Sequence, residues 1–185
     1  MHGGLDMNKK KYISLWLCLV LLIATIVLNS CGGSYMPPER ALNDFSNRIE
    51  RGNLSNLTLT IYYMDLSLTP FPLSVDDLVG GWYDHKIFVS GGELEEHIDL
   101  LQQVSADNLI PVAYECHMNA RMYYVFEANG RKIFGVVPRA DKYDSTMFIN
   151  GVEFVWIDAL FDVVRPFLPE DRFVNWGPGL QRDTE

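Results

Sequence analysis

Hydrophobic residues recur along this chain at two spacings, and each spacing predicts its own kind of element. Where they fall three or four residues apart, they predict helices over Glu39–Arg51 and Gly91–Ser105. Where they tend to alternate with polar residues, among β-branched and aromatic neighbours, they predict strands. The predicted strands are Leu57–Leu66, Asp84–Val89, Val112–Met118, Arg121–Ala128, Arg131–Val137, Thr146–Ile149 and Val152–Trp156.

Turn and capping residues set the limits of these elements. Ser90, followed three residues later by Glu93, predicts a capping box at the start of the second helix. Asn129-Gly130 and Asn150-Gly151 each predict a tight hairpin, because both residue types accept the positive φ angles of such turns. A third helix is predicted over Asp158–Arg165, with its first residue as the N-terminal cap. Two of the remaining connections are predicted to be loops, Ser67–Gly81 and Pro138–Asp144. The first of them is expected to contain one helical turn near Val75–Val79.

This order of elements predicts an α+β fold. We expect an antiparallel sheet, mostly a C-terminal meander containing the two hairpins, with two or three helices packed on one face. The strands do not alternate with regular helices, as they would in a doubly wound nucleotide-binding sheet. The length of 185 residues suits one globular domain, which we expect over residues 39–171. A tail over residues 172–185 follows, and its apolar residues are Phe173, Val174 and Trp176.

The N-terminal segment has a pattern unlike the rest of the chain. Three lysines, Lys9–Lys11, precede the apolar run Ile13–Leu28, and small polar residues follow it. This order is typical of a secretory signal peptide. A membrane-spanning helix is the alternative, but a span needs roughly 20 apolar residues. The run here is shorter and contains Ser14 and Thr25.

The residues Leu28-Asn29-Ser30-Cys31 resemble the lipobox of bacterial lipoproteins, with leucine three positions before the cysteine and a small residue directly before it. The resemblance implies that diacylglycerol is transferred to the Cys31 thiol and that residues 1–30 are cleaved off as the signal peptide. Asn29 departs from the family pattern, in which Ala, Ser or Thr is commoner. The resemblance covers the export segment alone, and no family is recognised for the domain. The sequence leaves open whether translation starts at Met1 or at Met7.

A lipid on Cys31 predicts where the protein lies. Two acyl chains anchor a protein stably, at about 0.8 kcal/mol per buried methylene, whereas a single chain binds only marginally. We therefore expect a lipoprotein on the extracytoplasmic face of the cell membrane, held through residues 31–38 as a flexible tether.

Charge and cysteine content narrow the classes of partner. The formal net charge is −9, and residues 1–30 contribute +2 to it, so the remaining residues carry −11. An acidic body argues against nucleic acid and against electrostatic docking on anionic lipid. Cys18 would leave with the signal peptide and Cys31 would carry lipid, so Cys116 has no partner for a disulfide. We expect Cys116 to be a buried thiol.

Histidine and cysteine offer few combinations for catalysis or metal binding. Glu115 and His117 would share one face of the strand predicted there, with Cys116 on the other face. That alternation separates Cys116 from His117, so a thiolate–imidazole pair is not expected. Zinc usually takes three or four protein ligands, and neither His85 nor His97 belongs to a short-spaced ligand pair. No metal site is therefore assigned.

Aromatic side chains are the more promising candidates for recognition. Trp82-Tyr83, Tyr123-Tyr124 and Trp176 could line a binding surface, since aromatic rings supply contact area at low entropic cost. The alternative for each pair is that one ring belongs to the core and the other to the sheet surface. The carboxylate pairs Asp76-Asp77 and Glu95-Glu96 could imitate acid and base groups, but adjacent acids are expected in so acidic a chain. No nucleophilic-serine motif or phosphate-binding loop is found.

These observations favour a binding or interaction module with no assigned catalytic residue, metal or cofactor. The expected partners are the membrane, through acyl chains on Cys31, and another envelope protein or a peptide, but no nucleic acid. We expect a monomer. Two alternatives stay open: an envelope hydrolase with an unrecognised site among Asp, Glu and His residues, and an immunity or inhibitor lipoprotein that captures a cationic peptide.

Overall fold

The computed structural model describes residues 36–65, 71–113, 117–139 and 145–169. All of these residues belong to one compact unit, Met36–Glu185. The lipobox with Cys31, the apolar run Ile13–Leu28 and the tail 172–185 with its Trp176 lie outside the described residues.

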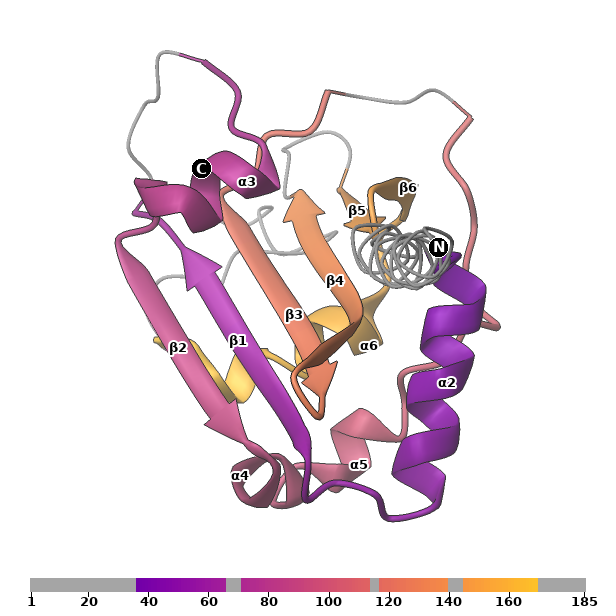
Figure 1. Ribbon diagram of the computed structural model, residues 1–185. Helices are drawn as coiled ribbons and strands as arrows, with labels where there is room; N and C mark the ends of the chain where they lie inside the picture. The colour runs from indigo at the N-terminus through magenta and orange to yellow at the C-terminus, as the bar shows by residue number, and fades with distance from the viewer. Residues whose placement is uncertain (1–35, 66–70, 114–116, 140–144, 170–185) are drawn as a thin grey trace, which may run out of the picture. The chain divides into compact units, whose positions relative to one another are not determined.

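Six strands form one antiparallel sheet in the order β2-β1-β3-β4-β5-β6 (Figure 1). From β3 onward, strands that follow each other in sequence are neighbours in the sheet, which is the predicted C-terminal meander. The α+β class is therefore confirmed. The strands are β1 (Leu57–Tyr63), β2 (His85–Ser90), β3 (Met122–Ala128), β4 (Arg131–Arg139), β5 (Thr146–Ile149) and β6 (Val152–Val155).

Both Asn-Gly hairpins are also confirmed. The φ angles of Asn129 and Gly130, between β3 and β4, are 52° and 70°. Those of Asn150 and Gly151, between β5 and β6, are 49° and 86°. Two consecutive positive φ angles give a turn whose twist matches that of the flanking strands, so each dipeptide fixes its hairpin locally.

The inner face of the sheet, defined as the face covered by most of the helices, forms the larger core. It is covered by α2 (Pro38–Glu50), α4 (Gly91–Glu95), α5 (Ile98–Leu101) and α6 (Asp158–Asp162), followed by the short 3-10 turn η2 (Arg165–Phe167). The helix α2 matches the predicted Glu39–Arg51 to within one residue at each end. Gly52 ends it at a φ of 68°, a conformation that glycine adopts without strain.

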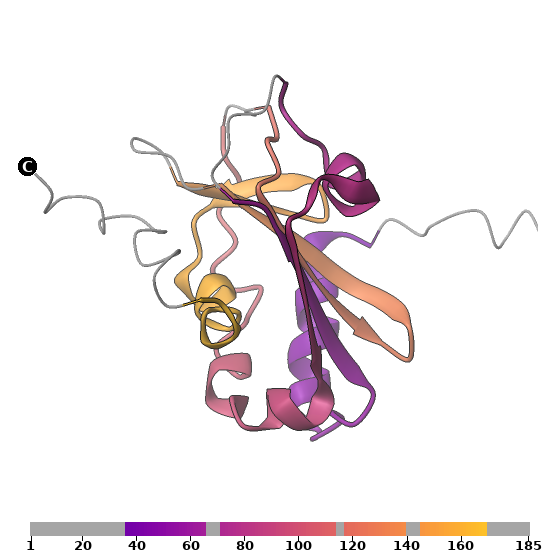
Figure 2. The same ribbon diagram turned by 90° about the vertical axis from the view of Figure 1, so that its left-hand side faces the viewer.

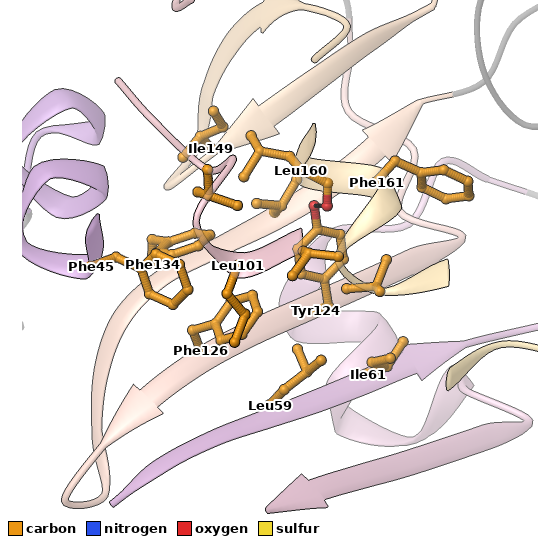
Figure 3. Close-up of a cluster of buried hydrophobic side chains, with 14 of the residues drawn as sticks. Phe45, Leu59, Ile61, Leu101, Tyr124, Phe126, Phe134, Ile149, Leu160 and Phe161 are labelled. Atoms are coloured by element: carbon orange, nitrogen blue, oxygen red, sulfur yellow. Dashed lines mark hydrogen bonds between the residues drawn. The ribbon is translucent and has the colours of Figure 1, made fainter. Parts of the chain in front are cut away.

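Aromatic rings fill the centre of this core (Figure 3). The ring of Phe45, from α2, lies 4.8 Å from that of Phe126 and 5.2 Å from that of Phe134, measured between centroids. The hydroxyl of Tyr124 donates a hydrogen bond to the carbonyl oxygen of Leu160 in α6. The polar end of this buried ring is thereby satisfied, as a buried hydroxyl requires.

The outer face of the sheet, defined as the opposite face, is covered only in part. The short helix α3 (Val75–Asp77) and the irregular turn η1 (Leu78–Trp82) lie on it, on the side away from α4–α6 (Figure 2). They confirm the helical turn predicted near Val75–Val79. A second, smaller core results, whose fully or almost fully buried members include Leu73, Leu78, Tyr123, Val125, Val137 and Phe148.

The single helix predicted over Gly91–Ser105 is wrong, because the segment forms two helices, α4 and α5. The capping box itself is confirmed, with the amide of Ser90 donating to the carboxylate of Glu93 at 2.8 Å. The break lies at His97, whose φ and ψ are −117° and 29° and whose ring meets that of Phe167 edge-on at 5.1 Å. After the break, α5 contacts both α2 and α6, so tertiary packing overrides the helical period.

The strand predicted over Val112–Met118 is wrong for those of its residues that the structure describes. They belong to no strand. Instead, Pro111 forms an isolated bridge with Phe154 at the edge of β6, and the amide of Val112 donates to the carbonyl of Glu153 at 3.3 Å. The second hydrogen bond of the bridge runs from the amide of Val155 to the carbonyl of Ile110 at 2.9 Å, so the missing amide hydrogen of Pro111 does not prevent it.

The loop predicted from Pro138 onward begins later than expected, because β4 continues to Arg139. Pairing between β3 and β4 ends at Val136, whereas Pro138 is paired with Met147 of β5. Beyond Val136 the strand therefore has a neighbour on one side only, a position in which proline is tolerated.

The cap predicted at Asp158 is also wrong. The residue before α6 is Ile157, and no side chain caps the helix. The carboxylate of Asp158 instead accepts a hydrogen bond from the indole nitrogen of Trp156 at 3.0 Å. The helix ends at Asp162, before the predicted Arg165.

Candidate functional site

Four side chains form a row of rings and cations across the outer face. The strand register places Tyr62 of β1 directly opposite Lys86 of β2 on one side and Tyr123 of β3 on the other. The two tyrosine rings are stacked, with centroids 6.4 Å apart and planes at 22°. Lys86 Nζ lies 5.0 Å from the Tyr62 centroid, and Lys132 Nζ, from β4, lies 5.7 Å from the Tyr123 centroid. Both distances suit cation–π contacts.

Tyr83, which precedes β2, extends this row towards α3. Its ring meets that of Tyr62 edge-on, with centroids 5.3 Å apart. Gly135 on β4 makes room on the other side, because a Cβ atom there would lie 2.7 Å from Cζ of Tyr123. The absence of a side chain at Gly135 thus lets the Tyr123 ring lie across the strand. We call Tyr62, Tyr83, Lys86, Tyr123 and Lys132 the tyrosine–lysine row.

The pKa values of three side chains in the row are shifted by burial, by contacts within the row and by nearby acids. A hydrogen bond from the Lys86 ammonium to Tyr62 raises the pKa of Lys86. Desolvation lowers the pKa of Lys132, and the charge of Asp76 acts in the opposite direction. Burial, followed by the charge of Glu127, raises the pKa of Tyr123 to about 12. The pKa values of Lys86, Tyr123 and Lys132 therefore all depart from their ordinary values.

Exposed apolar side chains flank the row. Phe88, on the outer face of β2, is 61% exposed. Near α3, Phe71 and Trp82 are each 45% exposed, and their rings meet edge-on with centroids 5.4 Å apart. Val79 in η1 is exposed as well. Exposed aromatic rings are a characteristic of protein recognition sites.

The aromatic residues singled out from the sequence differ in where the structure places them. In Tyr123-Tyr124 both rings are buried, Tyr124 in the larger core on the inner face and Tyr123 in the smaller core on the outer face. In Trp82-Tyr83 neither side chain is fully buried; Tyr83 belongs to the row, and Trp82 directly precedes it in the chain. Trp176 is outside the described residues. The structure therefore brings Trp82, Tyr83 and Tyr123 to one region of the surface.

The histidines and acids singled out from the sequence do not converge. His117 is exposed, while Glu115 and Cys116 lie outside the described residues. His85 Nε2 lies 3.1 Å from Asp65 Oδ1, and the two side chains are 40% and 49% exposed. Within the described ranges, no group of three or more His, Cys, Asp or Glu side chains could hold a metal ion.

The structure does not place either candidate carboxylate pair in an acid–base site. Asp77 accepts hydrogen bonds from the amide and hydroxyl of Ser74 in a capping box, and these bonds lower the pKa of its carboxyl group. Asp76 acts on the row only through its charge. Glu95 and Glu96 are exposed side chains at the end of α4.

Sequence reasoning missed Tyr62, Lys86, Phe88 and Lys132. Each belongs to a correctly predicted strand, and alternation placed Tyr62 with Thr60, and Lys86 with Phe88, on shared faces. What the pattern could not give is the pairing register, which decides that residues from four strands lie side by side.

Comparisons with protein families, with curated proteins and with solved structures find no match for this chain. In the part of the chain that the structure describes, no helix has the length and apolar character of a membrane span. The site must therefore be interpreted from its own chemistry.

Proposed function

We propose that this chain is a lipid-anchored extracytoplasmic protein whose domain binds an extended polypeptide segment of another envelope protein. The binding surface is the outer face of the sheet, formed by the tyrosine–lysine row and Phe88. The observation that carries the proposal is the row itself, in which two exposed lysines lie over the rings of a half-buried and a buried tyrosine on the outer face. Tyrosine combines a large apolar ring with a polar tip, which suits contact with a peptide.

The edge of the sheet supports an extended ligand. Among the described residues β2 pairs with β1 alone, so its other edge has backbone N–H and C=O groups that can pair with an added strand. A strand added beside β2 would lie next to Lys86 and Phe88 on the outer face. Backbone pairing would then supply affinity, and the adjacent side chains would supply specificity.

The two alternatives receive less support. A cationic peptide would meet Lys86 and Lys132 on this face, so like charges oppose its capture there. A hydrolase would need a shielded acid–base group, whereas the side chains of His85 and Asp65 are both partly exposed to solvent. Exposed ion pairs of this kind are common on protein surfaces and carry no catalytic implication by themselves.

The lipid anchor is tested by the variant Cys31→Ser. We expect it to lose labelling by a radioactive or clickable palmitate analogue and to accumulate as the uncleaved precursor. Cys116→Ser is the matched control, and it should be labelled and processed like the wild type. Normal labelling and processing of the Cys31 variant would contradict the anchor.

The binding surface is tested by photocrosslinking in intact cells. A photoreactive residue at position 86 should give a discrete crosslinked product, and the additional change Phe88→Ala should remove it. A photoreactive residue at Glu50, exposed on α2, is the control and should give no such product. Equal crosslinking from both positions, or a product that survives Phe88→Ala, would contradict the assignment of the outer face.

A further inference from the structure

We propose that Phe71, Val79 and Trp82, which we call the aromatic tip, form a second contact with the membrane beside the lipid anchor. The side chains would lie in the interfacial region of the bilayer, at the level of the lipid headgroups. This inference rests on the proposed lipidation of Cys31.

The first argument is the short reach of the tether. Five peptide units join Cys31 to Met36, so these two residues can be at most about 18 Å apart even when the chain is fully extended. Met36 belongs to the folded domain, because its carbonyl accepts a hydrogen bond from Asn150 Nδ2 at 3.1 Å and its side chain packs against the core. Pro38 begins α2 and is buried. A domain attached in this way stays close to the lipid surface.

The second argument is the position of the tip. In Figure 1, α2 runs antiparallel to β1, so the start of α2 and the end of β1 lie toward the same end of the sheet. α3 lies at that end too, on the outer face (Figures 1 and 2). The amide of Asp84 donates to the carbonyl of Tyr63 at 3.1 Å, which ties the segment after η1 to the end of β1. The aromatic tip is therefore at the end of the domain from which the tether leaves.

The third argument is the chemistry of the tip. Phe71 and Trp82 are each 45% exposed and pack edge-on against each other at 5.4 Å, and Val79 is 36% exposed beside them in the same segment. Tryptophan and phenylalanine favour the interface between water and lipid, where an amphipathic ring contacts both.

Charge does not drive this contact. The exposed acids Asp76, Asp77 and Asp84 lie in the same segment as the tip, and they would be repelled by anionic lipid. The contact must therefore come from insertion of the rings, and it should be weaker on anionic than on zwitterionic vesicles.

Quenching of tryptophan by brominated lipid tests the proposal. The full-length mature lipoprotein is reconstituted into phosphatidylcholine vesicles whose acyl chains carry bromine near the glycerol end. The contribution of Trp82 is the difference between the wild type and Trp82→Phe, which removes the effect of the other tryptophans. We expect this contribution to be lost to quenching in the brominated vesicles and retained in unbrominated ones.

The matched control is Phe88→Trp in the Trp82→Phe background, because Phe88 is more exposed than Trp82 but lies along β2, away from the tip. Its emission should be retained. Retained emission from Trp82, or quenching at both positions, would overturn the assignment of the tip. The acyl group on Cys31 is measured by mass spectrometry in the same samples: if it is present, such a result refutes the tip alone, and if it is absent, the anchor and the tip fail together.

Discussion

Adjacent residues on the two faces of β2 differ greatly in exposure. Val89, on the inner face, is 2% exposed, and the adjacent Phe88, on the outer face, is 61% exposed. Val89 is buried in the larger core under the helices, and burial alone explains its apolar side chain. Phe88 is large and aromatic although most of its ring is exposed. The difference teaches that burial explains Val89, whereas it does not explain the exposed ring of Phe88.

The same contrast distinguishes the two tyrosines of β3. Tyr124 points into the inner core, where its hydroxyl bonds to the carbonyl of Leu160. Tyr123 points outward, where its ring stacks on Tyr62 and contacts Lys132. Adjacent residues of one type thus serve packing on one face and surface chemistry on the other. Four substitutions test this division, and they are ordered here from the largest expected effect to the smallest.

Phe126→Ala should cause the largest loss of stability. Its ring is fully buried on the inner face and lies 4.8 Å from Phe45 and 5.1 Å from Phe134. Removing a buried phenylalanine ring costs about 3 to 5 kcal/mol, from lost transfer energy and the cavity that remains. Urea denaturation followed by circular dichroism measures the change. A loss below about 1 kcal/mol, typical of surface sites, would contradict the inner core.

Gly135→Ala should have the next largest effect. A Cβ atom at this position would overlap the Tyr123 ring, so the ring must leave its place over β4. Overpacking of this kind costs about 2 to 3 kcal/mol, and crosslinking from position 86 should fall as the row is disturbed. Gly92→Ala is the control, since nothing lies within 4 Å of a Cβ atom there. Equal stability of the two variants would show that Tyr123 does not lie across Gly135.

The local signals of the sequence predicted much of this fold. The capping box at Ser90 and the turns at Asn129-Gly130 and Asn150-Gly151 depend on residues within a few positions of each other, and each was found as expected. The failures depend on longer contacts. The predicted helix breaks at His97, whose ring contacts that of Phe167, seventy positions later in the chain. The Asp158 carboxylate accepts a hydrogen bond from the indole nitrogen of Trp156 and does not cap the helix.

The candidate site was harder to predict than the fold, for a related reason. Alternation in each strand assigns Tyr62 and Lys86 to a face, but only pairing places them opposite each other. Trp82 and Tyr123 could be singled out as aromatic residues, whereas the lysines that complete the row have no local signal. A site assembled from four strands depends on register, which no single segment of sequence contains.

Tyr123→Phe should change the alkaline limit of stability. Burial raises the pKa of Tyr123 to about 12 from an ordinary value near 10. The folded protein thus keeps a proton that the unfolded chain loses, so this contribution is complete below pH 10 and is lost as the pH rises towards 12. Two pKa units correspond to at most roughly 2.7 kcal/mol, and we expect about 1 to 2 kcal/mol because the ring keeps some access to solvent.

The measurement is the free energy of unfolding between pH 9 and pH 12. The wild type should lose more stability over this range than Tyr123→Phe. Part of the loss that remains in the variant comes from Tyr124 and Lys86, because the pKa values of both are raised in the folded protein. Parallel curves for the two proteins would mean that the Tyr123 hydroxyl is as well solvated in the folded state as in the unfolded chain.

Phe88→Ala should have the smallest effect on stability and a large effect on binding, and this separation is the sharpest test of the comparison between the faces. Its ring is mostly exposed, so its removal should change the free energy of unfolding by less than about 0.5 kcal/mol. The matched inner-face change, Val89→Ala, removes buried methyl groups and should cost about 1 to 3 kcal/mol. If Phe88→Ala destabilises the protein as much as Val89→Ala does, the Phe88 ring stabilises the fold, and this result would contradict the proposal that the outer face is a binding surface.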